Sequence, residues 1–498
     1  METNNRSLAI CSPGRCYTGQ MPDLPYTELI AVVVVMIYIT AIFSAIEAVL
    51  TVRTAQGAIA WIISLLTLPY LTLPLYLIFG RNRFDGYLEQ RSEIEAQTEA
   101  LSEETLEAIA RHTHHGDPAF PIYGSLARLA RLPATGGNEV RLLINGEACF
   151  DSIIEGLEKA ERYILLQSYI IRDDGLGGRI GDILARKASA GVRVFVLYDE
   201  IGCPRFWRTA LYRRLQDAGV QSAAFNTTQG RRNRLQLNFR NHRKIVVVDG
   251  HSAWLGGHNV GDEYLGLGKR GRWRDTHLRL RGPAVMGAEL AFATDWRWAT
   301  RRPVDIGWQF QNARHGDCRV LIFPSDPASD FEEAGLMYHE VIASARQRIW
   351  IASPYFVPDR SIVSALQLAA LRGVDVRVLI PDRPDGPVVG MANWAFTREL
   401  LPAGVNVYRY SEGFMHQKVF LMDDRLAGVG TANFDNRSFR LNFEITALVE
   451  DPDFCSQVEI MLQDDFAGSK RVLAQDIRDK PFWFPLAMGV ARLLSPVL

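Results

Sequence analysis

Two copies of one short polar pattern constrain this chain more than any other feature. Both copies read His-x-Lys-x4-Asp, and each is followed by an asparagine at the same spacing from its histidine. The residues are His242, Lys244, Asp249 and Asn259 in the first copy and His416, Lys418, Asp423 and Asn433 in the second. Such self-similarity indicates a chain that contains one structural unit twice.

Further segments repeat around these motifs. Residues 162–173 resemble residues 348–359, and residues 191–199 resemble residues 373–382. Each segment contains an apolar run of strand length, and Ala- and Leu-rich stretches typical of helices separate the runs. We therefore expect an α/β fold in which each half of the repeat is one α/β unit.

Two uncharged apolar stretches precede the repeat, at residues 29–46 and 58–79. Each has about the length needed to cross ~30 Å of hydrocarbon, so we expect two transmembrane helices. One alternative for the first stretch is a signal-peptide core, against which Asp23 and Glu28 count because a basic flank is typical there. Another is a buried helical hairpin, which Pro69 and Pro74 favour because they would kink the second stretch.

Arginines near these stretches predict their orientation. Only Arg53 lies between the two stretches, whereas five arginines flank the pair on its outer sides: Arg6, Arg15, Arg81, Arg83 and Arg91. The positive-inside rule places both outer flanks in the cytoplasm, and with them everything beyond residue 80.

The predicted domain organisation follows from these patterns. It consists of an N-terminal tail (1–25), two transmembrane helices (26–84), a charged linker (85–136), a first α/β domain (137–320), a second (321–480) and an apolar C-terminal tail (481–498). The tail contains Arg492 as its only charge. It is suited either to the membrane interface or to packing back on the domain.

Histidine and lysine two residues apart in a strand share a face, so each motif should present an imidazole and an ammonium side by side. The ammonium attracts phosphate oxygens, while the imidazole attacks phosphorus or donates a proton to a leaving oxygen. Two facing motifs would supply one nucleophile and one acid. Such double displacement requires no metal or other cofactor.

The carboxylates divide into two groups. Asp249 and Asp423 are candidate catalytic residues, but their odd spacing from the histidines and their turn-like contexts fit a structural role equally well. Asp275 and Glu444 are better candidates for orienting the imidazoles, because a carboxylate on one ring nitrogen fixes the tautomer. Ordinary salt bridges to neighbouring arginines are the alternative for this second pair.

The paired motifs resemble the phospholipase D superfamily, and the surrounding sequence resembles bacterial cardiolipin synthases. The stretches that carry the resemblance are Asn241 to Gly250, Gly261 to Gly266, Trp273 to His277, Ser353 to Asp359 and Gly430 to Phe439. With the N-terminal stretches, the resemblance covers nearly the whole chain. It implies two phospholipase D-like α/β domains related by pseudo-twofold symmetry, preceded by two N-terminal transmembrane helices, with one active site between the domains.

The resemblance also implies a reaction. Two phosphatidylglycerol molecules would be joined into cardiolipin with release of glycerol, through a phosphohistidine on His242 and with His416 as acid and then base. Asn259 and Asn433 would bind the phosphate. The expected location is the bacterial inner membrane, and the expected partners are phosphatidylglycerol and cardiolipin, with no nucleic acid; a homo-oligomer is left open. His258 departs from the small or apolar residue common in the family.

Several rivals remain on sequence grounds. A phospholipase D hydrolase and a phosphatidylserine synthase share the histidine chemistry until the acceptor arrives. A nuclease of the superfamily is disfavoured by the apolar stretches and by a net charge of -1. A CDP-alcohol phosphotransferase is excluded because residues 174–179 match only the start of its metal-binding motif. Basic residues around the first motif suit anionic lipid headgroups, although a solvated loop is the alternative: Arg231, Arg232, Arg234, Arg240, Arg243, Lys269, Arg270, Arg272 and Arg274.

Overall fold

The computed structural model describes residues 26–52, 54–80, 84, 86–88, 113, 122–225, 238–308 and 313–497. The predicted tail 1–25, most of the predicted linker 85–136 and the basic residues at 231, 232 and 234 lie outside this range. The chain divides into two compact units, Met1–Arg81 and Asn82–Leu498. We describe each unit by itself.

The N-terminal unit contains three apolar helices: α1 (Tyr26–Thr51), α2 (Ala55–Thr67) and α3 (Pro69–Phe79). They pack on one another through a small cluster of Ala41, Ala45, Ala48, Leu65 and Tyr76. Among the described residues, α1 is the helix long and apolar enough to cross a bilayer, with a mean hydropathy of 2.8. Most of its large apolar side chains are exposed, as expected of a helix that faces lipid.

The second apolar stretch differs from its prediction because it is not one continuous helix. It breaks at Leu68, whose φ of −132° and ψ of 56° are not helical. Pro69 explains the break, since a proline disfavours the helical conformation of the preceding residue and lacks an N–H group. The prediction of two transmembrane helices therefore stays a prediction.

The second unit contains both halves of the repeat on one 16-stranded mixed sheet, and four further short strands form two two-stranded sheets. The first-half strands are β1 (Thr135–Ile144), β2 (Tyr163–Ser168), β3 (Arg193–Asp199), β4 (Gln221–Phe225), β5 (Arg240–Asn241), β6 (Ile245–Val248), β7 (Ser252–Gly256), β8 (Trp273–Arg274) and β9 (Thr276–Arg281). The second-half strands are β10 (Cys318–Ser325), β11 (Arg348–Ala352), β12 (Phe356–Val357), β13 (Asp375–Pro381), β14 (Asn406–Tyr410), β15 (Phe414–Met415), β16 (Val419–Met422), β17 (Leu426–Gly430), β18 (Phe434–Asp435), β19 (Asn442–Glu450) and β20 (Ser469–Arg471).

The strand order repeats. From the outer edge of the first half inward it is β4-β3-β2-β6-β7-β9-β1, and from the second half it is β14-β13-β11-β16-β17-β19-β10, with β20 added outside β14. The two halves join where β1 pairs antiparallel with β10. This pairing makes the sheet continuous across the two halves. Strand β10 spans the predicted domain boundary at 320/321. This arrangement matches a mixed α/β fold with a repeated domain.

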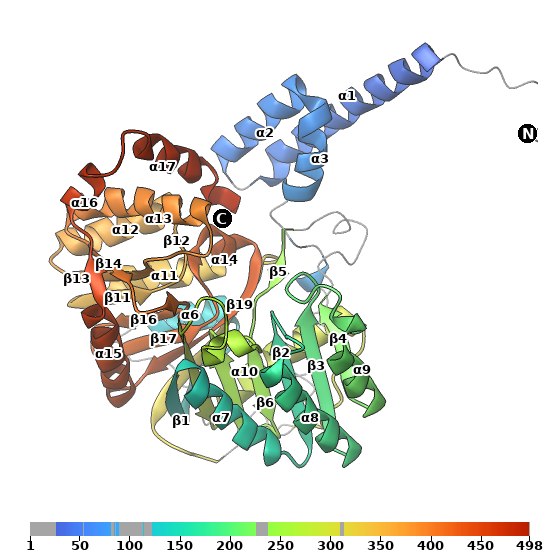
Figure 1. The fold of residues 1–498 in the computed structure, drawn as a ribbon, viewed down its shortest axis with the longest axis vertical. Helices are drawn as coiled ribbons and strands as arrows, with labels where there is room; N and C mark the ends of the chain where they lie inside the picture. The colour runs from blue at the N-terminus through green and yellow to red at the C-terminus, as the bar shows by residue number, and fades with distance from the viewer. Residues whose placement is uncertain are drawn as a thin grey trace, which may run out of the picture. The chain divides into compact units, whose positions relative to one another are not determined.

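Helices cover both faces of this sheet (Figure 1). They are α6 (Ile122–Ala130), α7 (Asn145–Glu158), α8 (Gly175–Ser189), α9 (Ala210–Asp217), α10 (Val285–Thr300), α11 (Glu333–Ser344), α12 (Arg360–Leu371), α13 (Pro387–Leu400), α14 (Asn436–Arg440), α15 (Pro452–Ala467), α16 (Ala474–Arg478) and α17 (Phe484–Leu493). Helices α7 to α9 cover one face of the first half, α11 to α13 one face of the second, and α10 and α15 the shared opposite face.

Coverage on both faces explains the continuous apolar strands. In β2, Tyr163 and Leu165 lie in the shared core, whereas Ile164 and Leu166 face α7 and α8. A strand buried on both faces carries apolar residues at every position rather than at alternate ones. The helical stretches expected between the strands are α8 and α12, each with an aspartate N-cap, Asp174 and Asp359.

Candidate active site

Each His-x-Lys motif lies where the chain crosses from one half of the unit to the other. Before His242, strand β5 pairs in parallel with β19 of the second half, and the His242 N–H donates to the Phe443 carbonyl at 2.9 Å. After Lys244, β6 returns to the first-half sheet. The sequence placed histidine and lysine within a strand, and the structure places them in the segment between two strands.

The second motif follows the same path in reverse. Strand β15 pairs in parallel with β8 of the first half, and the His416 N–H donates to the Arg274 carbonyl at 2.8 Å. After Lys418, β16 joins the second-half sheet. The two crossings bring both histidines to one pocket.

Each imidazole is held by a carboxylate from the opposite half. Nδ1 of His242 lies 2.9 Å from Oε2 of Glu444, and Nδ1 of His416 lies 2.7 Å from Oδ2 of Asp275. Both carboxylates are fully buried. The structure thus brings together the orienting residues that the sequence proposed, and these contacts leave Nε2 of each ring for the pocket.

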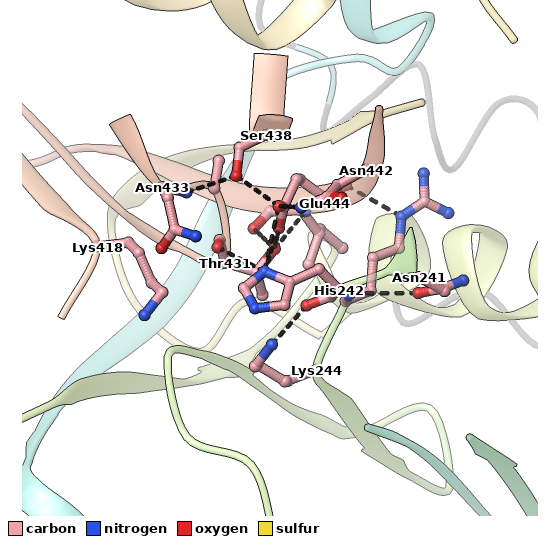
Figure 2. A network of polar contacts seen from close by, with 12 residues as sticks. Asn241, His242, Lys244, Lys418, Thr431, Asn433, Ser438, Asn442 and Glu444 are labelled. Atoms are coloured by element: carbon pink, nitrogen blue, oxygen red, sulfur yellow. Dashed lines mark hydrogen bonds and ion pairs between the residues drawn. The ribbon is translucent and has the colours of Figure 1, made fainter. Parts of the chain in front are cut away.

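Glu444 is itself held by three polar side chains that sequence reasoning did not single out. The hydroxyl groups of Thr431 and Ser438 donate to its carboxylate at 2.6 and 2.8 Å, and the Asn442 amide donates at 3.0 Å. Figure 2 shows this network around the His242 ring. Thr431 and Ser438 lie in the motif tail 430–439, whose polar residues were the available signal.

The lysines lie beside the imidazoles. The ammonium of Lys244 donates to the His242 carbonyl at 2.7 Å, and that of Lys418 lies 3.0 Å from Nδ1 of His416. Burial lowers the pKa of Lys244 to about 7 and that of Lys418 to about 8, because a low-dielectric site disfavours the ammonium form. These two groups therefore titrate close to neutral pH.

Both imidazoles favour the neutral form at pH 7, because their pKa values are lowered. Burial lowers the pKa of His242 against the opposing effect of Glu444, and burial together with the nearby ammonium groups holds the pKa of His416 well below its ordinary value. Burial alone would raise the pKa of Glu444, but the hydrogen bonds from His242 and Thr431 and the nearby Lys244 ammonium group keep this pKa below its ordinary value. The His242–Glu444 pair is therefore a neutral imidazole on a carboxylate.

Asp249 and Asp423 lie outside the pocket lining. The Asp249 carboxylate accepts three main-chain N–H bonds, from Glu161, Arg162 and Tyr163 at 2.7 to 2.8 Å. Asp423 does the same at the start of β11, accepting from residues 346–348. Both residues adopt the left-handed conformation, with φ of 55° and 51°. This geometry favours the turn role over the catalytic role that the sequence left open.

The pocket has a volume of about 870 Å³ and opens between the two motifs. Asn259 and Asn433 line it beside the histidines, as expected of phosphate-binding residues. Side chains from both halves complete the lining: Tyr169, Arg172, Arg240, Glu263, Tyr264, Lys269, Arg270, Trp273, Tyr355, Asp385, Val389, Phe414, Asp435, Arg437 and Asn442. Such a volume lies within the range of small-molecule binding pockets.

The basic residues near the first motif have separate roles. Arg240, Lys269 and Arg270 line the pocket, where Arg270 also pairs with Asp385 at 2.6 Å. Arg243, expected to face lipid, is instead buried, pairs with Asp295 at 2.8 Å and donates to the Glu444 carbonyl at 3.0 Å. It supports the strand that carries Glu444.

His258 lies in the core, as expected at a position where family members commonly carry a small or apolar residue. Its ring packs near Phe150, Tyr264 and His277, and Cys149, His258 and His277 bring ligand-type atoms within 4.8 Å of one another. All three residues are buried, and the His258 side chain is 4% exposed. Burial also raises the pKa of the Cys149 thiol well above its usual value. We therefore describe this group as core packing.

Comparison with known proteins identifies the family. The family described as "Cardiolipin synthase, PLD-like domain" matches residues 153–269 and 338–466, which include both motifs. "Cardiolipin synthase A" of Pseudomonas putida (strain GB-1) is 47% identical over 475 residues, covering 93% of this chain and 97% of the relative. The relative of the same name from Pseudomonas aeruginosa (strain LESB58) is 46% identical, covering 97% and 99%.

The chain belongs to the cardiolipin synthase family. It is therefore a phosphatidyltransferase of the phospholipase D superfamily, as the motifs suggested. The "Phospholipase_D-nuclease N-terminal" family matches residues 32–81, where α1 lies, in agreement with membrane association. A solved phosphatidylserine synthase from Haemophilus influenzae Rd KW20 shares the fold, with a TM-score of 0.58, 17% identity and coverage of 76% of this chain and 100% of that one.

Proposed function

We propose that this cardiolipin synthase joins two phosphatidylglycerol molecules into cardiolipin and glycerol through a phosphohistidine. One observation carries the proposal: two imidazoles line one pocket, and each is held at Nδ1 by a buried carboxylate from the other half. That arrangement supplies a nucleophile and a proton carrier for one phosphorus atom.

We assign the attack to His242. Its Nδ1 lies near two acceptors, Glu444 and the Thr431 carbonyl at 3.1 Å, so the Nδ1–H tautomer keeps the Nε2 lone pair available. Nε2 attacks phosphorus and the bond to the headgroup glycerol breaks. The lysine ammonium groups stabilise the negative oxygens of the transition state.

His416 carries the proton. The entering phosphodiester anion favours the imidazolium form and so offsets the lowered pKa of this ring. The imidazolium donates a proton to the departing glycerol oxygen. The neutral ring then accepts a proton from a hydroxyl of the second phosphatidylglycerol, whose oxygen attacks phosphorus and releases His242 as cardiolipin forms.

The proposed setting is the inner membrane, with the catalytic unit on the cytoplasmic side. Helix α1 has the length and hydropathy of a span. Helices α2 and α3 together have 24 residues (13 and 11), and the Thr72 hydroxyl bridges their junction by donating to the Ser64 carbonyl at 3.0 Å. Two short helices bridged in this way suit a second, kinked crossing, and the arginine distribution supports the orientation.

The test is a lipid assay with the purified full-length chain in phosphatidylglycerol vesicles containing EDTA. Equimolar cardiolipin and glycerol, formed by the wild type and abolished by His242→Ala or His416→Ala, are expected. Phosphatidic acid as the product would identify a hydrolase instead. Protein denatured at alkaline pH during turnover of phosphatidylglycerol radiolabelled at phosphorus should carry label on His242, because a phosphorus–nitrogen bond survives alkali but not acid, and label on His416 would reverse the two roles.

A further inference from the structure

The C-terminal helix α17 is apolar on two opposite faces. Phe484, Met488 and Ala491 are buried, and the first two form a small core with Ala395 of α13. On the outward face, Leu486 is 73% exposed and Leu493 is 80% exposed. A helix on a protein surface normally carries polar residues on its outward face, so this face is suited to an apolar environment.

The exposed apolar surface extends to the residues on either side of these two leucines. It consists of Phe482, Trp483, Leu486, Val490, Leu493 and Leu494, of which Phe482 is 96% exposed and Trp483 is 49% exposed. Aromatic side chains next to a helix N-terminus are typical of segments that lie at the boundary between headgroups and acyl chains. We call these six residues the α17 surface.

The α17 surface is tied to the wall of the active-site pocket. Just beyond the helix, the Ser495 carbonyl accepts a hydrogen bond from the Asn436 amide at 3.1 Å, and the same amide donates to the Val357 carbonyl at 3.0 Å. Val357, Asp435 and Arg437 line the pocket on both sides of this link. The surface therefore keeps a fixed position relative to the pocket.

Helix α13 supplies a second connection. Its middle residues Met391, Trp394 and Ala395 pack against α17, and its start, with Gly386 and Val389, lines the pocket. Figure 1 shows α17 lying along α13 at the edge of the second half. The α17 surface therefore lies on a helix that packs against α13, and α13 contributes to the pocket wall.

The charge of this region favours an anionic partner. Residues 469–498 contain five Lys and Arg residues and two Asp residues. The Lys480 ammonium lies 4.4 Å from the centre of the Trp394 ring, at the base of α17. Each basic residue near an anionic bilayer contributes about 1 kcal/mol of attraction, so the segment combines apolar insertion with electrostatic attraction.

We propose that the α17 surface docks into the headgroup region of an anionic phospholipid bilayer and holds the pocket next to its lipid substrates. The benefit for catalysis rests on the proposed function, whereas docking is a property of α17 that is measured separately. A second copy of the chain is the competing occupant, and it would leave Trp483 unquenched by bilayer lipids in the first experiment.

The first experiment uses the full-length chain in vesicles of phosphatidylglycerol and phosphatidylcholine, with or without brominated acyl chains that quench nearby tryptophans. The emission of Trp483 is obtained by subtracting the fluorescence emission of Trp483→Phe from that of the wild type. Quenching of this emission by about half or more is expected. Unquenched Trp483 emission would overturn the proposal, whether the surface is covered by a second copy or by water.

Trp308 is the matched control, because it is 36% exposed and lies away from the pocket. The neighbouring Gly307 carbonyl accepts from Arg162 just before β2 begins, whereas the pocket residue Tyr169 directly follows the end of β2. The emission assigned through Trp308→Phe should therefore be unaffected by bromination. Equal quenching of both tryptophans would also overturn the proposal.

The second experiment compares the double variant Leu486→Glu/Leu493→Glu with Leu371→Glu. Leu371 is 72% exposed at the end of α12, just before β13 begins, and is the control for adding charge to an exposed leucine. The activity of the double variant on vesicles should be about tenfold lower than that of the wild type, as expected when about 1.4 kcal/mol of interfacial binding free energy is lost. It should keep its activity on monomeric short-chain phosphatidylglycerol.

Equal losses on vesicles and on monomeric lipid would overturn the docking role. A wild type that makes no cardiolipin from either substrate would contradict the proposed function, yet the bromine quenching of Trp483 would still report docking. The two failures are thereby distinguished.

Discussion

Nδ1 of His242 lies 2.9 Å from the carboxylate of Glu444, a residue of the opposite half of the repeat. In the equivalent pair, Nδ1 of His416 lies 2.7 Å from the carboxylate of Asp275. For both motif histidines, the carboxylate at Nδ1 comes from the other half. Because each pair needs residues from both halves, the pocket is complete only when the two halves are joined.

We predict that Glu444→Gln lowers kcat about 10²- to 10⁴-fold, the range expected when a carboxylate that orients a catalytic histidine loses its charge. The amide keeps the shape of the side chain but does not stabilise the imidazolium. Asp275→Asn is the matched variant on the other histidine and should produce a loss of similar size. The measurement is kcat in phosphatidylglycerol vesicles, with the apparent Tm as a check on folding. A folded Glu444→Gln enzyme within threefold of wild type would contradict the prediction.

Asp249→Ala should reduce stability rather than turnover. Its carboxylate accepts three main-chain N–H bonds at the start of β2, and bonds to a charged group contribute about 1.5–3 kcal/mol each at most. We expect a loss of about 2–4 kcal/mol in the free energy of unfolding, with kcat per folded molecule within about threefold of wild type.

The control for that experiment is Asp424→Ala. The Asp424 side chain is 73% exposed and makes only a surface ion pair with Arg348, so its loss should change stability by less than about 1 kcal/mol. A large fall in kcat of Asp249→Ala at an unchanged Tm would restore the catalytic role that the sequence left open.

The sequence predicted the fold because each half carries its signals locally. Buried strands such as β2 and β3 are continuous apolar runs, and the Ala- and Leu-rich stretches between such runs form α8 and α12. The break at Leu68 was also foreshadowed, since Pro69 restricts the residue before it. Local patterns of this kind need no knowledge of tertiary contacts.

The cross-half pairing was beyond sequence reasoning. Strands β5 and β8 have two residues each, too short for any periodicity, yet they determine which carboxylate meets which histidine. Arg243 illustrates the same limit. It was grouped with the lipid-facing arginines, but its guanidinium is buried against Asp295 and supports Glu444 from 201 residues away along the chain.

The pH dependence of kcat/KM should report the two lysines of the free enzyme. Their pKa values of about 7 for Lys244 and about 8 for Lys418 are lowered by burial, so the ammonium forms exist below these values and are lost above them. We predict that kcat/KM on phosphatidylglycerol falls as pH rises from 7 to 9. The fall in kcat should be smaller, because a bound phosphodiester anion favours both ammonium groups.

The measurement is a pair of profiles from pH 6 to 9 at fixed ionic strength, with wild type and Lys244→Arg. Guanidinium stays charged throughout this range, so the variant's KM should depend less on pH, whatever its absolute activity. A wild-type kcat/KM that is constant between pH 7 and 9 would contradict the assignment.

His258→Leu should stabilise the protein, and more so in acid. The ring is 4% exposed, and neither nitrogen has a hydrogen-bond partner among the described atoms. Removing an unsatisfied buried polar group should raise the free energy of unfolding by about 1–2 kcal/mol at neutral pH. Burial lowers the pKa of His258 to about 3, so between pH 6.5 and 3 the unfolded chain binds a proton that the folded protein does not. Stability is therefore lost as pH falls below 6.5, by about 1.4 kcal/mol per pH unit for this group.

The leucine removes that penalty, so the advantage of His258→Leu over wild type should grow as pH falls from 6.5 to 5. His277 is buried in the same core, and its pKa is also about 3, so wild type and variant share its penalty and the difference between them isolates His258. The measurement is the apparent Tm in detergent at pH 7.5 and 5.0, with His251→Leu as the control that removes an exposed histidine. If the Tm shift of His258→Leu relative to wild type is the same at pH 7.5 and at pH 5.0, as is that of His251→Leu, His258 is not a neutral, unsatisfied core residue.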